Sequence, residues 1–363
     1  MILSVICFTR NGYDRMKELN QAGIKDLTIR MYCKSSQLKD ECPDIYVEEA
    51  IADWTEKQFA ARNAILFIGA TGIAVRSIAP FAENKLSDSP VLVMDDRGRY
   101  IIPLLSGHVG GANEIALSIA EKMGVVPVIT TATDINGKFA ADVFAKKNNL
   151  SIVNKPGIAA VSSKVLTGEK LTVIIGKDVP FDEEIRTAFE KAHAEDLILR
   201  AEDEADPSAE YDIFIGKKTD TSPDALLYLM PQKYVLGIGC RMGKTKEEIE
   251  HLALAQLDEL HLSGHEVCAI TSVVHKRMEK GLIDFARELN VPFLTYSAEE
   301  LESLEGDFSV SEFVKQTTGT GCVSERAAMY YCEGEGELIL RKVAENGVTL
   351  AIAEKKWRLD FYE

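Results

Sequence analysis

Short apolar runs alternate with amphipathic segments through the first part of the chain. The runs predict buried strands, and the segments between them, apolar every three or four residues, predict helices. Strands that alternate with helices predict a mostly parallel, doubly wound sheet. Val125–Ile129 in particular predicts a strand covered on both sides. The predicted strands are Ile2–Phe8, Leu27–Tyr32, Ala64–Ile68, Pro90–Asp95 and Val125–Ile129.

The same alternation returns near Tyr234. Apolar runs there predict four strands, and capping boxes at Thr245 and Ser297 predict two helix starts. A further helix is expected from about Lys276 to Asn290. The predicted strands are Tyr234–Gly239, Val267–Ser272, Pro292–Tyr296 and Val348–Ala353.

The pattern weakens between these two halves. Strands are expected at Leu171–Ile175 and Ile213–Ile215, with a helix from about Glu183 to Ala194, and the charged stretch 200–207 predicts a solvated loop. A capping-box pattern at Thr55 predicts another helix start in the first half. The fold class is therefore α/β, with two doubly wound, mostly parallel domains at 1–141 and 231–363. A smaller intermediate region, 142–230, joins them.

One stretch, Pro103–Asp134, concentrates polar chemistry around a helix. The helix has one apolar face, and Gly124 is placed to end it in a left-handed conformation. A helix start after a glycine turn offers free N–H groups to an anion. Polar residues also follow the next strand, where ligands bind in open α/β sheets. The polar candidates before the helix are Ser106, Gly107, His108, Gly110, Gly111 and Asn113, and those after the strand are Thr130, Thr131 and Asp134.

Two of these residues have alternative interpretations. His108 is as consistent with a capping role as with a general base or a hydrogen-bond donor. Asp134 stands just before Asn136-Gly137, and capping that turn is slightly the simpler interpretation.

Two further glycine turns carry cations. Gly69, Thr71 and Gly72 lead into a helix whose Arg76 has apolar neighbours, so Arg76 is expected to meet an anion. Gly237–Thr245 resembles a P-loop and a dinucleotide fingerprint, but the glycines of both patterns are misplaced. We interpret this second stretch as an anion-binding turn around Gly239, to which Arg241 and Lys244 add charge.

Two charged pairs near the end of the chain have a plain interpretation. Lys276 and Glu279 are spaced to share one helical face, so an exposed ion pair is the default expectation. Glu325 and Arg326 have the same default.

Composition narrows the class of protein. The 363 residues are 46% hydrophobic and 27% charged, and 41 basic against 57 acidic residues give a net charge of −16. This charge argues against broad binding to nucleic acid or anionic membranes. Seven cysteines without a C-x-x-C pair argue against a zinc or iron–sulfur site. No run reaches membrane-spanning length and no basic leader is present, so a cytoplasmic location is expected.

Six blocks together resemble the cobalt-precorrin-5A hydrolases of anaerobic cobalamin biosynthesis. The first three are GATGIAVRSIAPF from Gly69, LLSGHVGGANEIA from Leu104 and VITTATD from Val128. Similar to the family's C-terminal domain are LGIGCRMG from Leu236, the S-x-x-x-K-x-x-E pattern from Ser272 and GTGCVSERAA from Gly319. The blocks occur in the family's order and span nearly the whole chain.

The resemblance implies a reaction on a cobalt-bound corrin precursor that carries a δ-lactone. Water opens the lactone, and a two-carbon unit leaves as acetaldehyde. Cobalt comes with the substrate, so no protein cofactor or metal site is expected. Our hypothesis for the catalytic residues is His108, which would activate water or polarise the lactone carbonyl, and Asp134, which would orient His108 or handle a proton as acetaldehyde leaves. The implied substrate-binding residues are Gly69, Thr71, Gly72, Arg76, Ser106, Gly107, Gly110, Gly111, Asn113, Thr130, Thr131, Gly239, Arg241, Lys244, Lys276, Glu279, Gly319 and Glu325.

Two rival functions stay open at this point. The glycine turns would also serve a tetrapyrrole carrier without catalysis, which would release no acetaldehyde. A nucleotide-dependent enzyme would instead use the Gly237–Thr245 turn. The expected partner is the tetrapyrrole, without nucleic acid or membrane, and self-association or transient contact with the pathway's methyltransferases is left open.

Overall fold

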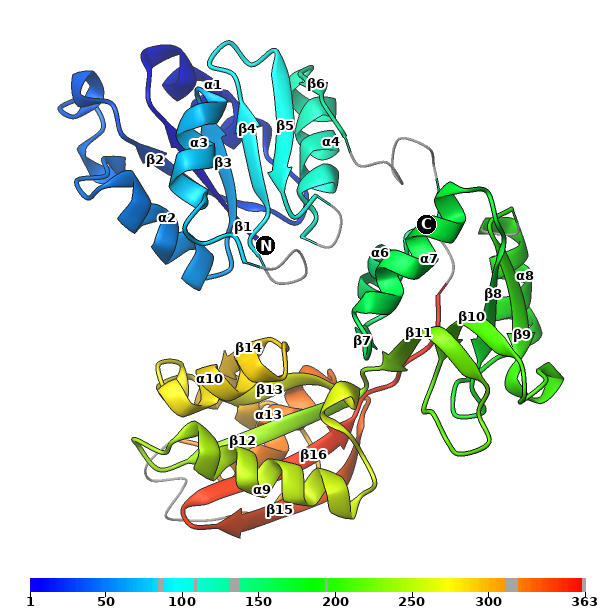
Figure 1. The fold of residues 1–363 in the computed structure, drawn as a ribbon. Coiled ribbons are helices and arrows are strands. Elements are labelled where there is room, and N and C mark those ends of the chain that lie inside the picture. Colours follow the sequence, from blue (N-terminus) through cyan, green and yellow to red (C-terminus); the bar gives the residue numbers. More distant parts are fainter. Residues whose placement is uncertain (84–87, 108–109, 131–137, 193–194, 311–318, 361–363) are drawn as a thin grey trace. The chain divides into compact units, whose positions relative to one another are not determined.

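The computed structural model describes residues 1–83, 88–107, 110–130, 138–192, 195–310 and 319–360. The chain forms two compact units, Met1–Lys138 and Phe139–Glu363, which between them hold three sheets (Figure 1). The first two sheets are mostly parallel and the third is mixed, with two parallel and two antiparallel pairings. Helices lie between strands in all three, so the predicted α/β class is confirmed. Across the described residues, no helix has both the length and the apolar character that a membrane span requires.

The first unit is one six-stranded sheet with strand order β2-β1-β3-β4-β5-β6. Helices α1 and α4 share one apolar core with the sheet, and α2 and α3 share the core on its other face. Its elements are β1 (Ile2–Cys7), α1 (Arg10–Ala22), β2 (Thr28–Cys33), α2 (Ile51–Ala60), β3 (Ala64–Ile68), α3 (Thr71–Ile78), β4 (Val91–Met94), β5 (Tyr100–Leu105), α4 (Ala112–Met123) and β6 (Val126–Pro127).

Strand β5 reverses the direction of this sheet. Strands β1 to β4 are parallel, but β5 is antiparallel to β4, with Val91 paired to Leu105 and Met94 to Ile101. Strand β5 therefore ends at the edge of the sheet formed by the strand ends where β4 begins. The turn before α3 lies at the other edge, because it follows the end of β3 and Gly69 donates its N–H to the carbonyl of Met94.

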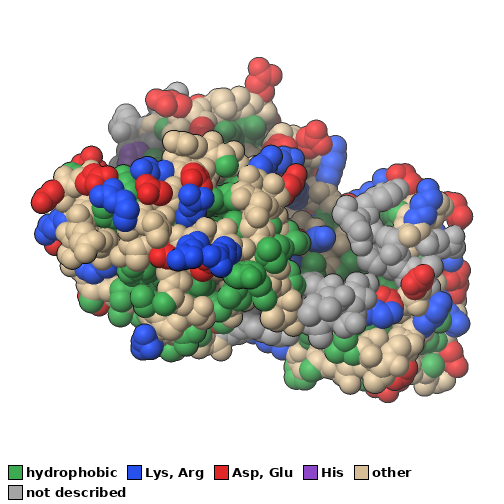
Figure 2. Space-filling view, turned by 90° about the horizontal axis from the view of Figure 1, so that it is seen from above, with side chains coloured by type: hydrophobic (Ala, Val, Ile, Leu, Met, Phe, Trp, Pro, Cys, Tyr) green, Lys and Arg blue, Asp and Glu red, His purple; other side chains and the backbone are tan. Residues whose placement is uncertain are grey.

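The second unit begins with a five-stranded sheet in the order β7-β11-β10-β8-β9, in which only β7 is antiparallel to its neighbour. Its elements are α6 (Ala141–Lys147), β7 (Leu150–Ile152), α7 (Pro156–Leu166), β8 (Leu171–Ile175), α8 (Glu183–Ala192), β9 (Leu197–Ala201), β10 (Glu210–Ile215) and β11 (Asp224–Pro231). Charged side chains of both signs are interspersed over the face of the molecule drawn in Figure 2.

The last sheet has the order β14-β13-β12-β16-β15, with α9 and α10 on one face and α13 on the other. Helix α13 packs directly on β12, because a Cβ at Gly237 would lie 1.9 Å from the carbonyl oxygen of Ser324. Its elements are β12 (Tyr234–Cys240), α9 (Lys246–Glu259), β13 (Val267–Val273), α10 (Lys280–Glu288), β14 (Phe293–Tyr296), α11 (Ala298–Glu302), α13 (Val323–Tyr331), β15 (Glu337–Glu345) and β16 (Val348–Glu354).

Three local predictions were wrong. Thr55 does not begin a helix, because α2 starts at Ile51 and the Thr55 hydroxyl donates to the carbonyl of Ile51 at 2.8 Å. Val125–Ile129 is not a doubly covered strand. Only Val126–Pro127 pairs, at the sheet edge, where Val126 is 54% exposed and the missing N–H of Pro127 is tolerated.

The charged stretch 200–207 is not simply a solvated loop. It begins in β9 and continues into a short 3₁₀ turn, Glu202–Glu204. The carboxylate of Glu202 is buried and accepts hydrogen bonds from the N–H of Lys177 and the hydroxyl of Ser222. A long-range pairing of this kind leaves no trace in local charge patterning.

Candidate active site

The turn between β5 and α4 is tightly folded around its glycines. Ser106 has a positive φ of 52°, and a Cβ at Gly110 would lie 2.3 Å from the Ser106 Cβ and 2.5 Å from its carbonyl oxygen. Gly111 caps α4 at φ 90°, and Gly124 ends it at φ 67°. The predicted left-handed cap at Gly124 is thus confirmed, and only glycine fits the turn at position 110.

This turn satisfies some of its own backbone donors and leaves others without a partner among the described residues. The N–H groups of Ala112 and Asn113 donate to the carbonyls of Ser106 and Gly107 at 3.2 and 2.9 Å. Within the described residues, no partner accepts from the N–H of Gly110 or Gly111. Two adjacent free N–H groups at the start of a twelve-residue helix suit an anionic oxygen.

The start of α3 combines free N–H groups with a cation. Thr71 and Gly72 form its first turn, and the guanidinium of Arg76 folds back over it, with Nη1 and Nη2 3.5 Å from the Cβ position of Gly72. Arg76 is exposed and has no ion pair or hydrogen bond within the described part of the chain. A cation beside a helix N-terminus is unfavourable by itself, so this arrangement favours an anionic ligand.

The two glycine turns of the first unit are not brought together. Gly69, Thr71, Gly72 and Arg76 lie at the edge where β3 ends, whereas the Ser106–Gly111 turn lies at the edge where β4 begins. Thr130 follows β6, which runs alongside β5 toward the second of these edges. His108, Thr131 and Asp134 lie outside the described residues, so their predicted roles stay predictions.

The loops at the carboxyl end of β12 and β13 form a third candidate edge. Arg241 is exposed, donates its N–H to the carbonyl of Gly347 at 2.9 Å, and has no side-chain partner in the described part of the chain. Gly239 lies beneath the start of α13, because its Cβ position is 3.6 Å from the Cβ of Val323. Lys244 pairs with Glu248 at 2.6 Å, within the predicted capping box of α9.

The predicted exposed pair of Lys276 and Glu279 is a connector between loops. Lys276 Nζ and Glu279 Oε2 are 3.0 Å apart, but the side chains are only 16% and 11% exposed. The other carboxylate oxygen of Glu279 accepts from the N–H of Gly243 at 2.8 Å. Lys276 ends a 3₁₀ turn and Glu279 caps α10, so they do not share a regular helix face. Glu279 thereby ties the β13–α10 loop to the β12–α9 loop.

The predicted pair of Glu325 and Arg326 is also wrong. Glu325 is fully buried and accepts from the N–H and hydroxyl of Ser309 and from the N–H of Lys342, at 2.7 to 2.8 Å. Burial raises the pKa of Glu325, but these three donors outweigh it and hold the pKa below its ordinary value. Arg326 donates instead to the carbonyls of Leu301 and Leu304. This geometry favours a structural role for Glu325.

The start of α13 already holds a carboxylate. Glu302 Oε1 accepts from the hydroxyl of Thr320 at 2.7 Å and from the N–H of Gly321 at 3.0 Å, and it lies 3.4 Å from Arg326 Nε. Gly319 precedes them with φ 81°. An internal carboxylate thus occupies the donors that follow Gly319, the residue that was predicted to bind the substrate.

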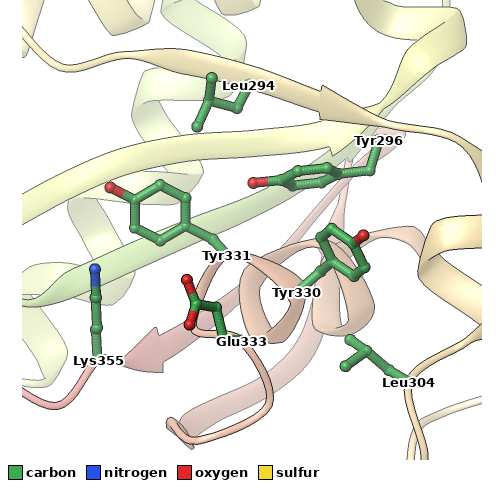
Figure 3. Close-up of a pocket in the computed structure, with 7 residues that line it drawn as sticks. All are labelled: Leu294, Tyr296, Leu304, Tyr330, Tyr331, Glu333 and Lys355. Atoms are coloured by element: carbon green, nitrogen blue, oxygen red, sulfur yellow. The ribbon is translucent and has the colours of Figure 1, made fainter. Parts of the chain in front are cut away.

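A cavity of about 620 Å³ lies beside α13 in the same sheet layer, and local sequence patterns did not predict it. Figure 3 shows three tyrosine rings between Leu294 and Leu304, with the charged ends of Lys355 and Glu333 beside Tyr331. Burial raises the pKa of Tyr296 and Tyr331 to about 12, so both hydroxyls stay protonated near neutral pH. The lining residues come from β14, α13 and the segments after α11 and β16, which only the folded chain assembles.

Comparison with known proteins gives consistent matches. Residues 53–134 match the family model "Cobalamin synthesis G N-terminal", and residues 234–353 match "Cobalamin synthesis G C-terminus". The cobalt-precorrin-5A hydrolase of Salmonella typhimurium is 33% identical over 353 residues, which cover 96% of this chain and 97% of that protein. The cobalt-precorrin-5A hydrolase of Priestia megaterium is 29% identical over 309 residues, covering 81% and 79%. Among solved structures, CobE, from the cobalamin biosynthetic pathway, is 28% identical, covers 35% of this chain and 94% of its own, and has a TM-score of 0.33.

Proposed function

Because this chain belongs to the cobalt-precorrin-5A hydrolase family, we propose that it hydrolyses the δ-lactone of cobalt-precorrin-5A and releases acetaldehyde, giving cobalt-precorrin-5B. Family membership makes it a hydrolase of cobalamin biosynthesis, and the specific reaction is the proposal. The observation that carries it is the pair of N–H groups at Gly110 and Gly111, which have no partner within the described residues and stand two and three positions after His108 in the sequence. An ester-opening enzyme needs such donors for its oxyanion.

In the first step His108 accepts a proton from water, and the water oxygen forms a bond to the lactone carbonyl carbon. The carbonyl oxygen becomes an oxyanion and accepts hydrogen bonds from the N–H groups of Gly110 and Gly111. As the carbonyl reforms, the ring C–O bond breaks, and the imidazolium returns its proton to the leaving alkoxide. The products of this step are a carboxylic acid and a free hydroxyl on the two-carbon unit.

In the second step the free hydroxyl loses its proton, and Asp134 is the proposed acceptor. The C–C bond to the macrocycle breaks, its electron pair stays with the conjugated macrocycle, and the two-carbon unit leaves as acetaldehyde. Asp134 alternatively orients His108 during the first step. Cobalt enters with the substrate in either case. The guanidinium groups of Arg76 and Arg241 have no partner within the described residues, and each is proposed as an anion site of its own unit.

The test is an anaerobic assay of purified protein with cobalt-precorrin-5A that follows acetaldehyde and product mass. We expect stoichiometric acetaldehyde, and we expect His108→Ala to lower turnover by about 10²–10⁴-fold, the usual contribution of a general base. His251→Ala, on the exposed surface of α9, is the matched control and should keep full turnover. Near-normal turnover of His108→Ala would remove His108 from the mechanism, and binding without acetaldehyde would favour a carrier.

A further inference from the structure

The three most exposed large hydrophobic side chains in the described part of the chain all lie at one sheet edge. Met242, Met278 and Val310 are 91%, 79% and 70% exposed, whereas the next, Met1, is 57% exposed. Scattered apolar side chains on a surface need no explanation, but apolar side chains gathered in one place mark an interaction site.

Contacts between the loops establish that these residues share an edge. Met242 and Met278 flank the hydrogen bond from the N–H of Gly243 to Glu279 Oε1, which joins the loops after β12 and β13. Val310 packs against Gly321, because a Cβ added at Gly321 would lie 3.5 Å from Cγ1 of Val310. Gly321 precedes Cys322, the N-cap of α13, and the start of α13 packs over Gly239 near the end of β12. The two methionines and Val310 are here called the apolar rim.

Charge at the same edge restricts what the apolar rim can bind. Arg241, next to Met242 in the chain, has an exposed guanidinium without a partner in the described residues. The carboxylates nearby are engaged: Glu279 by Lys276 and Gly243, Glu302 by Thr320 and Gly321. A ligand for this edge therefore needs an apolar surface next to an anionic group. Methionine suits such a surface, because its flexible and polarizable side chain adapts to the ligand's shape.

We propose that the apolar rim is a substrate-recognition surface, on which the face of the corrin macrocycle lies against Met242 and Met278 while Arg241 binds one of its peripheral carboxylates. This inference rests on the proposed function for the identity of the macrocycle. It assigns a specificity role to side chains that carry no acid, base or nucleophile. The methionines contribute to substrate binding, and they do not change the rate at which the bound substrate reacts.

The test is steady-state kinetics of Met242→Ser, Met278→Ser and the double variant with cobalt-precorrin-5A, together with Kd from the corrin absorbance bands. Both side chains are almost fully solvated, so the variants should unfold at the wild-type temperature. We expect KM and Kd to rise roughly tenfold for each methionine, equivalent to about 1.4 kcal/mol, at unchanged kcat. Leu254→Ser is the matched control, because Leu254 is 40% exposed in the middle of α9 of the same sheet layer.

The outcomes separate the two proposals. If the wild-type protein neither binds cobalt-precorrin-5A nor releases acetaldehyde, the proposed function fails. If it does both and the double variant keeps the wild-type KM and Kd, the apolar rim is not a substrate surface. A double variant that changes the sedimentation coefficient without changing KM would likewise overturn the proposal and assign the apolar rim to an interface between copies of this chain.

Discussion

The starts of α4 and α13 are built from the same kind of sequence, but they differ in whether a carboxylate of the chain already binds their donors. Both helices follow turns rich in glycine and hydroxyl residues. At α4 the N–H groups of Gly110 and Gly111 have no partner in the described residues. At α13 the carboxylate of Glu302 accepts from Thr320 and Gly321. A glycine turn before a helix therefore indicates an anion site, but not whether the anion comes from outside or from the chain itself.

The largest effect should come from adding a side chain within the turn before α4. In Gly110→Ala the new Cβ would meet Ser106 at 2.3 Å, so the turn must rearrange and the free N–H groups must move. We expect turnover to fall about 10²–10³-fold, as when an oxyanion-hole donor is lost. Gly124→Ala is the matched control: its Cβ meets nothing within 4 Å, and the residue at φ 67° should cost about 1–2 kcal/mol of stability. Equal turnover of the two variants would contradict an active role for the open turn.

The next effect tests whether Glu325, in the first turn of α13, has a structural role. Glu325→Gln replaces a fully buried carboxylate that three donors hold, and an amide cannot accept from all three. We expect a loss of about 1–3 kcal/mol in the free energy of unfolding, measured by urea titration, with kcat and KM unchanged while the protein is folded. A raised KM at unchanged stability would instead restore the substrate-binding role that the sequence suggested.

A smaller effect is expected at the open start of α3. Arg76→Gln removes an exposed cation without partners in the described residues, so the melting temperature should not change. We expect KM to rise roughly tenfold, or about 1.4 kcal/mol, because one charged contact to the substrate is lost. Arg30→Gln, on the exposed edge strand β2, should leave KM as it is. The idea of an anion site at α3 would not survive equal KM values for the two variants.

The smallest effect is a pH dependence. The pKa of Glu325 is lower in the folded protein than its ordinary value, so its stabilising contribution is complete above the ordinary glutamate pKa and is lost as the pH falls through the folded pKa. The difference in unfolding free energy between wild type and Glu325→Gln should therefore shrink on acidification. Urea titrations at a series of pH values below neutrality measure it, and a constant difference would mean that the carboxylate is not charged in the fold.

Local signals predicted the elements well. The strand at Ala64–Ile68, the capping box of α9 and the left-handed end of α4 at Gly124 each follow from a few neighbouring residues. The direction of β5 does not follow from its residues, because an apolar run does not indicate whether its strand is parallel or antiparallel to its neighbour. Its reversal places the glycine turns before α3 and α4 at opposite edges of the sheet.

Contacts between residues distant in the sequence could not be predicted from local patterns either. Glu302 and Thr320 are 18 residues apart, and Glu279 meets Gly243 across 36 residues. Sequence proximity instead suggested pairing Glu325 with its neighbour Arg326, and the fold gives each a different partner. Proximity in the sequence therefore did not predict which residues these side chains contact.

The reversal of β5 also has a consequence for inhibition. The two turns of the first unit lie at opposite edges of the sheet, separated by the length of β3, whose five residues extend about 17 Å. Two small anions could occupy the starts of α3 and α4 at the same time. Inhibitors directed at one edge should therefore be mutually non-exclusive with inhibitors of the other.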